Sequence, residues 1–487
     1  MMPVSATMKN SAFRSVRVVP PVRLVAALVA GAVLAGCAGT PYHTPAVQLP
    51  DQWKQAAGHT REGVYGSRWW TSLGDSQLTA LIDDALARNP DLAVAAWKVR
   101  SARLAVGNAV GNMLPTPSAN VSVSSSRALD SDTANSSRSS SASLGVSWEV
   151  DLWGRLAASK RMADWEAAAT EQDREAAAQA LVATVAKTDW QIATLDQKIE
   201  RQRASIDTAR KTLQIAEVQY RAGSISGLDL AQSRQTLASQ EAALTTYVQQ
   251  RVEQRHALSI LFDAPPESLP EAAQHPRLPA LAALPAIPAG VPADVLGRRP
   301  DLQAAEMRLR ESLANVDATR TSYYPTLTLT GTLGSGSASL ANVLGNPVAT
   351  LGAGLVLPFL KFGEMQRNTA IAQSSYEQAI ISFRKTLYSA LADVENALSN
   401  RTQLQTQEAR LTESLAQARR AEELTRIRYR AGAVAMKIWL DAQETRRTAE
   451  MALLDVQLNR ADNLVTTYQA LGGAPVLQAV PVGGPAR

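Results

Sequence analysis

Residues 181–223 read LVATVAKTDWQIATLDQKIERQRASIDTARKTLQIAEVQYRAG, with no proline and no glycine before the last position. Apolar or aromatic residues recur at every seventh position of this stretch: Val185, Ile192, Ile199, Ile206, Leu213 and Tyr220. A sustained seven-residue repeat predicts a long helix that packs against its neighbours with a left-handed supercoil. The closing glycine predicts the end of the helix, because glycine readily takes the left-handed conformation that terminates helices.

The helix is predicted to be longer than this stretch, because residues 155–222 lack glycine and proline throughout. The same holds for residues 364–431. A continuous helix of that length would measure about 100 Å at 1.5 Å per residue. A shorter helix is predicted after each one, over residues 228–264 and 433–471. The first of these carries leucines at the same spacing at positions 230, 237, 244 and 258.

The two halves of the chain repeat each other. Asn89-Pro90-Asp91-Leu92 returns as Arg299-Pro300-Asp301-Leu302, and the Tyr-Arg-Ala-Gly of residues 220–223 returns at 429–432. The offset of about 210 residues is too long for a solenoid unit and predicts a duplicated half-molecule. We expect the first repeat over 75–264 and the second over 300–475, each beginning with a helix. The proline-rich residues 265–299 would form an extended linker between them.

Each half also contains a predicted β-hairpin, over residues 119–150 and 326–357. Apolar side chains alternate with serine, glycine, threonine or acidic residues there, as in Leu144, Val146, Trp148 and Val150. The serine-rich residues 125–141 are interpreted as the loop of the first hairpin. Such alternation is typical of a membrane barrel wall, but also of a soluble hairpin with one buried face.

Four strands cannot close a barrel, and open sheet edges are not tolerated in lipid. If the strands lie in a membrane, several chains must therefore share one barrel. Three chains would supply twelve strands, enough for an open lumen, and twelve long helices that continue it as a tunnel. The predicted fold class is mixed but mainly α, with an α-helical tunnel and a shared β-barrel.

The N-terminus has the pattern of a targeting segment. Residues 1–36 contain basic residues and no acid, and residues 24–34 form an apolar run. The run ends in Leu-Ala-Gly before Cys37, the only cysteine of the chain. This resembles a bacterial lipobox, which implies a signal peptide over 1–36 and acylation of Cys37. The alternative is a buried cysteine without a modification. Residues 37–74 would be the acylated extension and 476–487 a flexible tail.

Composition excludes several classes of protein. The net charge of +5 falls to about +1 without the four basic residues of the targeting segment, so nothing predicts binding to nucleic acid. The four histidines are scattered, and no metal, nucleotide or nucleophile motif is present. No later segment is apolar enough to predict a transmembrane helix. We therefore expect no cofactor, no metal site and no enzymatic activity.

Several motifs together resemble a known family. They are Trp69-Trp70, the Asn-Pro-Asp-Leu of residues 89–92 and the VPADVLGRRPDL of residues 291–302. With the lipobox and the paired Tyr-Arg-Ala-Gly turns, the chain resembles the outer membrane factor family, in the lipoprotein branch that serves resistance-nodulation-division transporters. The resemblance implies a homotrimer anchored in the outer membrane, with a large periplasmic portion. The implied partners are a periplasmic adaptor protein and an inner-membrane transporter of that class.

The resemblance also implies roles for residues of the two turns. Tyr220, Arg221 and Gly223, and their counterparts Tyr429, Arg430 and Gly432, would lie at the periplasmic tips and contact the adaptor. The alternative is that each motif only ends a helix and turns the chain.

A second implied role is that of a gate. Asp441 would form a ring of three carboxylates on the trimer axis, with Lys437 either paired to it or facing outward. Asp229 would be a weaker counterpart in the first repeat. The alternative for Asp441 is a solvated surface aspartate.

The resemblance implies an efflux channel for small molecules, and two other functions stay open. A duct of the same fold could serve type I protein secretion. A coiled-coil scaffold lipoprotein without a pore is the more distant alternative.

Overall fold

The structure is a computed structural model and describes residues 39–54, 68–127, 136–266, 268–279, 297–473 and 477. The predicted signal peptide, Cys37, residues 280–296 of the predicted linker and the final residues 478–487 lie outside the described residues. The chain divides into two compact units. The sheet unit comprises Met1–Tyr42, Ala109–Arg161 and Leu313–Gln373, and the helical unit comprises His43–Asn108, Met162–Ser312 and Ser374–Arg487.

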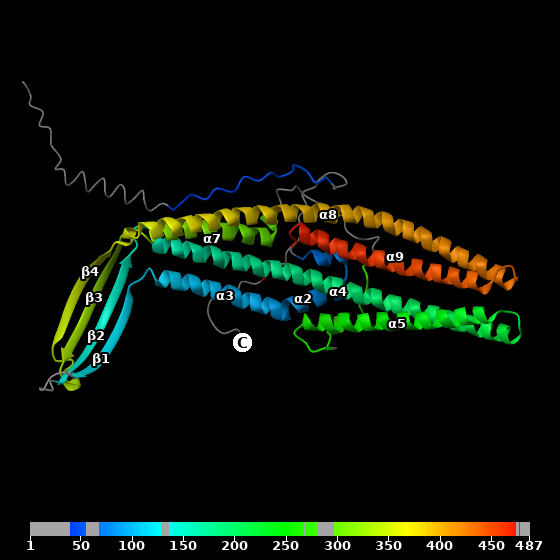
Figure 1. The fold of residues 1–487 in the computed structure, drawn as a ribbon, viewed down its shortest axis with the longest axis horizontal. Coiled ribbons are helices and arrows are strands. Elements are labelled where there is room, and N and C mark those ends of the chain that lie inside the picture. Colours follow the sequence, from blue (N-terminus) through cyan, green and yellow to red (C-terminus); the bar gives the residue numbers. More distant parts are fainter. Residues whose placement is uncertain are drawn as a thin grey trace, which may run out of the picture. The chain divides into compact units, whose positions relative to one another are not determined.

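The longest elements of the chain are two antiparallel pairs of helices (Figure 1). The first pair is α4 (Arg155–Arg221) and α5 (Gly227–Ile260), and the second is α8 (Phe362–Arg430) and α9 (Met436–Ala470). The mainly helical fold with a small sheet is confirmed. The predicted bounds of the shorter helices were too wide, since α5 ends at Ile260 and α9 begins at Met436.

The first repeat begins with two helices where the sequence predicted one. They are α2 (Ser76–Arg88) and α3 (Pro90–Gly111), and the break lies at Asn89. The Oδ1 of Asn89 accepts a hydrogen bond of 2.9 Å from the Leu92 N–H, so this side chain caps α3. In the second repeat, Gly297 and Arg298 are helical, the helix breaks at Arg299, and α7 (Pro300–Thr321) follows. Proline is favoured at the first helical position because its missing N–H would have no partner there.

Short 3-10 helices lie between these elements. They are η1 (Trp69–Leu73), η2 (Glu271–Ala273), η4 (Leu340–Asn342) and η5 (Pro358–Leu360).

The seven-residue pattern marks the buried face of α4. Val185, Ile192, Ile199 and Ile206 are at most 3% exposed, and the prediction is confirmed for them. It is wrong for Tyr220, which is 48% exposed, because the helix has reached its end there.

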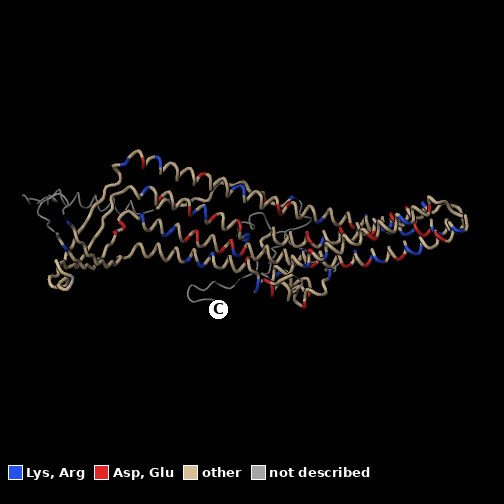
Figure 2. Tube along the Cα trace, turned by 60° about the horizontal axis from the view of Figure 1, so that its bottom comes forward, with Lys and Arg blue, Asp and Glu red and all other residues tan. Residues whose placement is uncertain are grey.

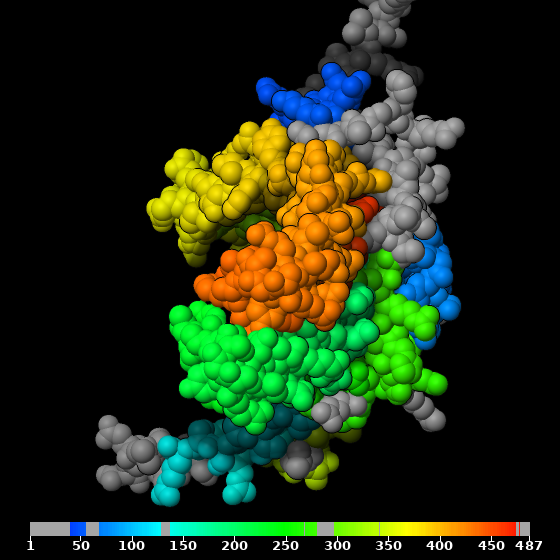
Figure 3. Space-filling model, turned by 90° about the vertical axis from the view of Figure 1, so that its right-hand side faces the viewer, coloured from blue at the N-terminus to red at the C-terminus, as the bar shows by residue number. Residues whose placement is uncertain are grey.

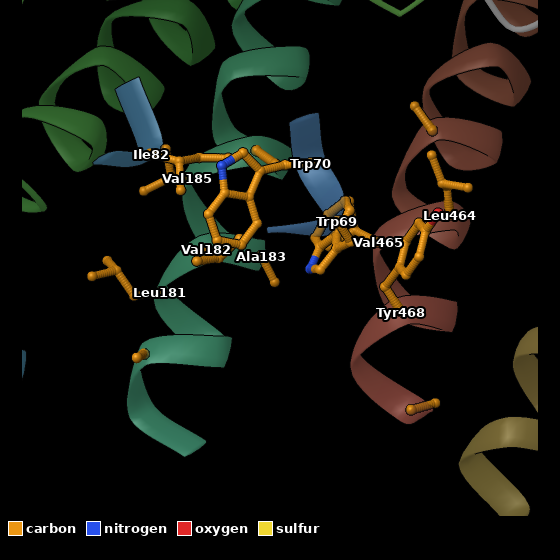
Figure 4. Packing of buried hydrophobic residues seen from close by; sticks show 14 of the residues in the cluster. Trp69, Trp70, Ile82, Leu181, Val182, Ala183, Val185, Leu464, Val465 and Tyr468 are labelled. Atoms are coloured by element: carbon orange, nitrogen blue, oxygen red, sulfur yellow. The ribbon is translucent and has the colours of Figure 1, made fainter. Parts of the chain in front are cut away.

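One apolar cluster forms the core of the helical unit (Figure 4). Trp69 and Tyr468 stack with ring centroids 4.5 Å apart, and Trp70 is fully buried beside them. Val182 and Val185 of α4 and Val465 of α9 belong to the same cluster. The Trp69-Trp70 motif therefore joins residues before α2 to helices of both repeats.

Charged residues are frequent along the helices and rare in the strands, which are almost entirely tan in Figure 2. Several pair across neighbouring helices. Glu450 of α9 is buried and lies 3.1 Å from Arg419 of α8, and it also pairs at 2.9 Å with Arg446 of its own helix. Within the described residues, no helix has a stretch both long and apolar enough to cross a membrane.

The sheet unit contains four antiparallel strands in the order β1-β2-β3-β4. They are β1 (Thr116–Arg127), β2 (Ser136–Val150), β3 (Thr326–Ser337) and β4 (Pro347–Val356). The predicted serine-rich loop was wrong, because β1 extends to Arg127 and β2 begins at Ser136. Serine hydroxyls pair across these strands, Ser122 with Ser141 at 2.8 Å and Ser124 with Ser139 at 3.0 Å.

The register gives the sheet two chemically different faces. Side chains of paired residues point to the same face, so the pairing of Ala119 with Leu144 and of Leu144 with Leu333 defines an apolar face. The opposite face holds almost only serine, threonine and glycine, as at Ser143 and Thr332. Both faces are largely solvent-exposed in the single chain.

Candidate functional site

The two predicted tips are tight turns of the same design. Gly223 ends α4 with φ of +74° and Gly432 ends α8 with φ of +73°, the region that glycine adopts without strain. The Ser224 N–H donates to the Gln219 carbonyl and the Ala433 N–H to the Arg428 carbonyl, each at 2.9 Å. These hydrogen bonds satisfy carbonyls that the ends of the helices would leave unpaired.

The tips of the two helical pairs, α4 with α5 and α8 with α9, pack against each other, as Figure 3 shows from the side of the turns. Ala216 and Leu230 of the first pair contact Met436 and Leu440 of the second in one buried cluster. The Ser233 hydroxyl also lies 3.2 Å from the Met436 sulfur. The turns of the two repeats, about 210 residues apart in sequence, therefore form one structure.

The two repeated tyrosines are not equivalent. The Tyr429 hydroxyl donates a 2.5 Å hydrogen bond to Oε1 of Gln219, and its ring stacks on Trp439 with centroids 5.1 Å apart. Burial raises the pKa of Tyr429, and the nearby Asp229 adds to the shift. Tyr220 is exposed instead. Tyr429 thus joins the two helical pairs, whereas the side chain of Tyr220 is accessible to another molecule.

The two tip arginines face solvent. Neither Arg221 nor Arg430 forms an ion pair with any residue in the part of the chain that the structure describes. Arg221 and Tyr220 line a groove of about 740 Å³ along α4 and α5, together with Leu230 and Arg234. This groove offers apolar surface and guanidinium donors side by side.

Lys437 and Asp441 form an ion pair within α9. The Lys437 Nζ lies 2.7 Å from Asp441 Oδ2 and 2.9 Å from Oδ1. Both side chains are more than half exposed, so the pair contributes little to the stability of one chain, about 0.5 kcal/mol or less. The sequence left the partner of Lys437 open, and the structure pairs it with Asp441.

Asp229 has a local structural role that the sequence analysis missed. It accepts a 3.1 Å hydrogen bond from the Ser226 N–H, while the Ser226 hydroxyl accepts from the Asp229 N–H at 3.2 Å. This reciprocal capping box begins α5. Counted from the turn glycines, Asp229 corresponds to Ile438 and not to Asp441. The serine three residues before the acid was the signal that could have shown this.

The described residues nearest to Cys37 are bound to the sheet unit. Thr40 donates to Asp317 of α7 from its N–H at 2.8 Å and from its hydroxyl at 2.6 Å. A Cβ at Gly39 would lie 2.8 Å from Nη2 of Arg161, so a larger residue would not fit without a shift. The start of the described chain is therefore fixed beside α7.

The described residues contain no cluster of three or more histidine, cysteine or acidic side chains that could hold a metal ion. A polar groove of about 610 Å³ lies between α8 and α9, with Asn396, Asn400, Asn459 and Asn463 among its lining residues. Asp393, Asp462 and Arg299 also line it.

Comparison with known proteins gives matches over most of the chain. The family described as "Outer membrane efflux protein" matches residues 81–262 and 291–473. The pyoverdine export outer membrane protein OpmQ of Pseudomonas putida is 31% identical over 451 residues, which cover 90% of this chain and 95% of OpmQ. The toxin and drug export protein A of Aggregatibacter actinomycetemcomitans is 28% identical over 455 residues, which cover 93% of this chain and 98% of that protein.

A solved structure is similar as well. The open state of the MtrE outer membrane channel of Neisseria gonorrhoeae superposes with a TM-score of 0.77 at 29% identity. The match covers 90% of this chain and 98% of MtrE.

Proposed function

The chain belongs to the family of outer membrane efflux proteins, and from this membership we propose that it is the outer-membrane channel subunit of a tripartite efflux pump. Three copies form a passive duct for small molecules, with a shared twelve-stranded barrel and a periplasmic tunnel of long helices. A periplasmic adaptor and an inner-membrane resistance-nodulation-division transporter engage this duct and drive export. The chain itself acts as a channel and not as an enzyme.

The observation that carries this proposal is the two-faced sheet with open edges. One face is apolar and exposed, as lipid requires, and the other offers hydroxyl groups to a water-filled lumen. β1 and β4 each pair on one side only. Because unpaired strand edges are not tolerated in lipid, β4 of one copy would pair with β1 of the next.

An exposed stripe on α3 supports the association of copies. Val94, Trp97 and Leu104 are each more than half exposed and lie three and seven residues apart. This spacing places them on one face of the helix. Large apolar side chains exposed on one face of a helix are typical of an interaction surface.

The tips are proposed as the contact with the adaptor. The groove beside Tyr220 and Arg221 is open, and Arg221 and Arg430 are exposed, while Gly223 and Gly432 hold the turns. An adaptor helix or loop with carboxylate and carbonyl acceptors would find charged donors next to apolar surface.

Asp441 is proposed as the gate of the duct. Three copies of an exposed carboxylate close to a threefold axis would attract cations and restrict the passage. Lys437 on the same helix would moderate that field, because its Nζ pairs with the carboxylate in each chain. Asp229 would contribute only by holding the start of α5, through its capping box.

Lipid attachment at Cys37 is also part of the proposal. Cys37 precedes Thr40 by only a few residues, at most about 11 Å of extended chain. Thr40 is bound to Asp317 in the last turns of α7, directly before β3 begins. Acyl chains on Cys37 would therefore start near the end of the sheet that adjoins the helices, called here the helix-side end. At this end a membrane-embedded sheet would meet the periplasmic surface of the outer membrane.

A protein-secretion duct is the second candidate. The name of the Aggregatibacter relative includes both toxin and drug export, so similarity alone leaves both classes of cargo possible for this chain.

Conductance in a planar bilayer tests the channel and the gate together. We expect the full-length lipoprotein to form small cation-selective pores, and Asp441→Ala to raise the conductance about two-fold and reduce selectivity. Lys437→Ala should increase cation selectivity, because it uncovers the carboxylates.

Glu413→Ala is the matched control, since Glu413 is an exposed acid of α8 paired with Arg410 and should leave the pore unchanged. If the pores of Asp441→Ala and wild type are identical, Asp441 is not the gate, but the proposal that the protein forms a duct still holds. A folded trimer that forms no pore would support the scaffold function instead.

A further inference from the structure

The strands contain very few charged residues, and their placement is uneven. Among the described strand residues only Arg127, Arg138 and Glu149 carry a charge. Glu149 lies at the helix-side end of β2 on the hydroxyl-bearing face and is paired with Arg155 at 2.7 Å. Both positive charges lie at the other end of the sheet.

The register places Arg127 and Arg138 next to each other on the apolar face. Arg138 pairs with Ser125, and Arg127 pairs with Ser136, so the two arginines are diagonal neighbours across β1 and β2. The same face continues from Ser125 to Val123 and Val121 along β1. Diagonal neighbours on one face have Cβ atoms about 7 Å apart.

Two neighbouring positive charges are unfavourable unless an anion lies between them. Both side chains are exposed, and neither is ion-paired with a residue that the structure describes. Arginine binds phosphate through paired N–H donors, and two guanidinium groups at this separation can hold one phosphate from both sides.

The distance between the arginines and the aromatic end of the sheet matches a lipid layer. Trp148 lies at the helix-side end of the same face, where its Nε1 donates to the Met113 carbonyl at 3.0 Å. About ten residues of β2 separate Trp148 from Arg138, or about 33 Å along the strand. At a tilt of about 40° this corresponds to an apolar height of about 25 Å, the band expected of an outer-membrane barrel.

We propose that Arg127 and Arg138 form a binding site for the phosphate groups of lipid A in the outer leaflet of the outer membrane. The inference rests on the proposed function, because it requires the sheet to stand in that membrane with its hairpin loops outward. The apolar side chains below the arginines, Val121, Val123 and Leu144, then contact the acyl chains of the same lipid. Lipid A is the occupant because it combines acyl chains with exposed phosphates at that surface.

The test measures lipid binding to the intact trimer by native mass spectrometry. The probes are diphosphoryl lipid A, lipid A stripped of its phosphates, and phosphatidylglycerol. We expect wild type to bind diphosphoryl lipid A about tenfold more tightly than either other lipid, and R127Q/R138Q to lose this preference. R127K/R138K should recover part of it, since lysine keeps the charge without the paired donors.

R203Q/R420Q is the matched control, because it removes two exposed helix arginines with the same change in net charge. The control should keep the full preference. A preference retained in R127Q/R138Q would overturn the inference, and equal binding of phosphatidylglycerol would overturn the assignment to lipid A.

Conductance of the same preparations separates this inference from the proposed function. If wild type and R127Q/R138Q both form pores and the variant keeps the wild-type lipid preference, the lipid A site is contradicted and the channel function is not. A wild-type trimer that never enters a bilayer would remove the proposed function itself.

Discussion

At the scale of single residues, Asp189 of α4 has an environment that penalises its charge. It is 4% exposed, and its Oδ1 has no hydrogen-bond partner among the described residues. Burial raises its pKa to about 7, and the nearby Asp75, which caps α2, adds to the shift. A carboxyl group with a raised pKa in the folded state stabilises the fold only while it is protonated.

Asp189→Asn should therefore stabilise the protein at alkaline pH. The contribution of the protonated group is complete below the ordinary pKa of 3.8 and is lost as the pH rises through about 7. We expect a higher thermal midpoint than wild type at pH 8, equivalent to a gain of at most about 4 kcal/mol in the free energy of unfolding, and little difference at pH 4. Asp196→Asn is the control, because its carboxylate is paired with Arg251. A pH-independent effect of Asp189→Asn would contradict the assignment.

At the scale of elements, the two tip turns differ in how the following helix begins. α5 has the capping box of Ser226 and Asp229, whereas α9 begins after Ala435, whose side chain makes no cap. The duplicated turns thus keep the glycine that the backbone requires and differ in the side chains that stabilise the next helix. The α9 tip, which carries Asp441, has the less stabilised start.

Ser226→Ala should loosen the first turn of α5 by about 1 kcal/mol, which corresponds to roughly fivefold faster hydrogen exchange of its first amides. Ala435→Ser is the reciprocal variant and should slow exchange at the start of α9. Exchange measured by mass spectrometry on the trimer reports both directly. No change in α5 exchange for Ser226→Ala would show that tertiary contacts, and not the cap, hold this end.

At the scale of the whole molecule, the open edges of the sheet require partners from other copies. β1 and β4 are the edge strands, and their continuation into a closed barrel makes them antiparallel neighbours between subunits. The apolar face of each edge strand includes sites suited to cross-linking, such as Val121 of β1 and Ala349, Leu351 and Ala353 of β4.

A cysteine at Val121 combined with one at Ala349, Leu351 or Ala353 should form a disulfide between subunits in at least one register. Denaturing gels without reductant would then show most of the protein as a covalent trimer. The Val121→Cys variant alone is the control and should stay monomeric on the gel, because β1 strands of different copies are not neighbours. A dimer as the largest product would contradict the threefold arrangement.

Local patterns in the sequence determined the long helices, the turn positions and the alternation in the strands. These features depend on backbone conformation and on which side chains can face a neighbour. The lack of glycine and proline in residues 155–222, the glycines at 223 and 432, and the alternation around Leu144 were therefore sufficient to predict them. The length of the first hairpin was not, because serine is a poor strand former until a neighbouring strand pairs with it.

Only the tertiary structure decided which members of the repeated motifs are equivalent. Tyr220 and Tyr429 stand in the same four-residue motif, yet Tyr429 is held by Gln219 and Trp439 while Tyr220 is exposed. The burial of Asp189 and the neighbouring positions of Arg127 and Arg138 likewise depend on packing and strand register. The physical reason is the same in each case: the partner that determines the environment of a side chain comes from another helix or strand.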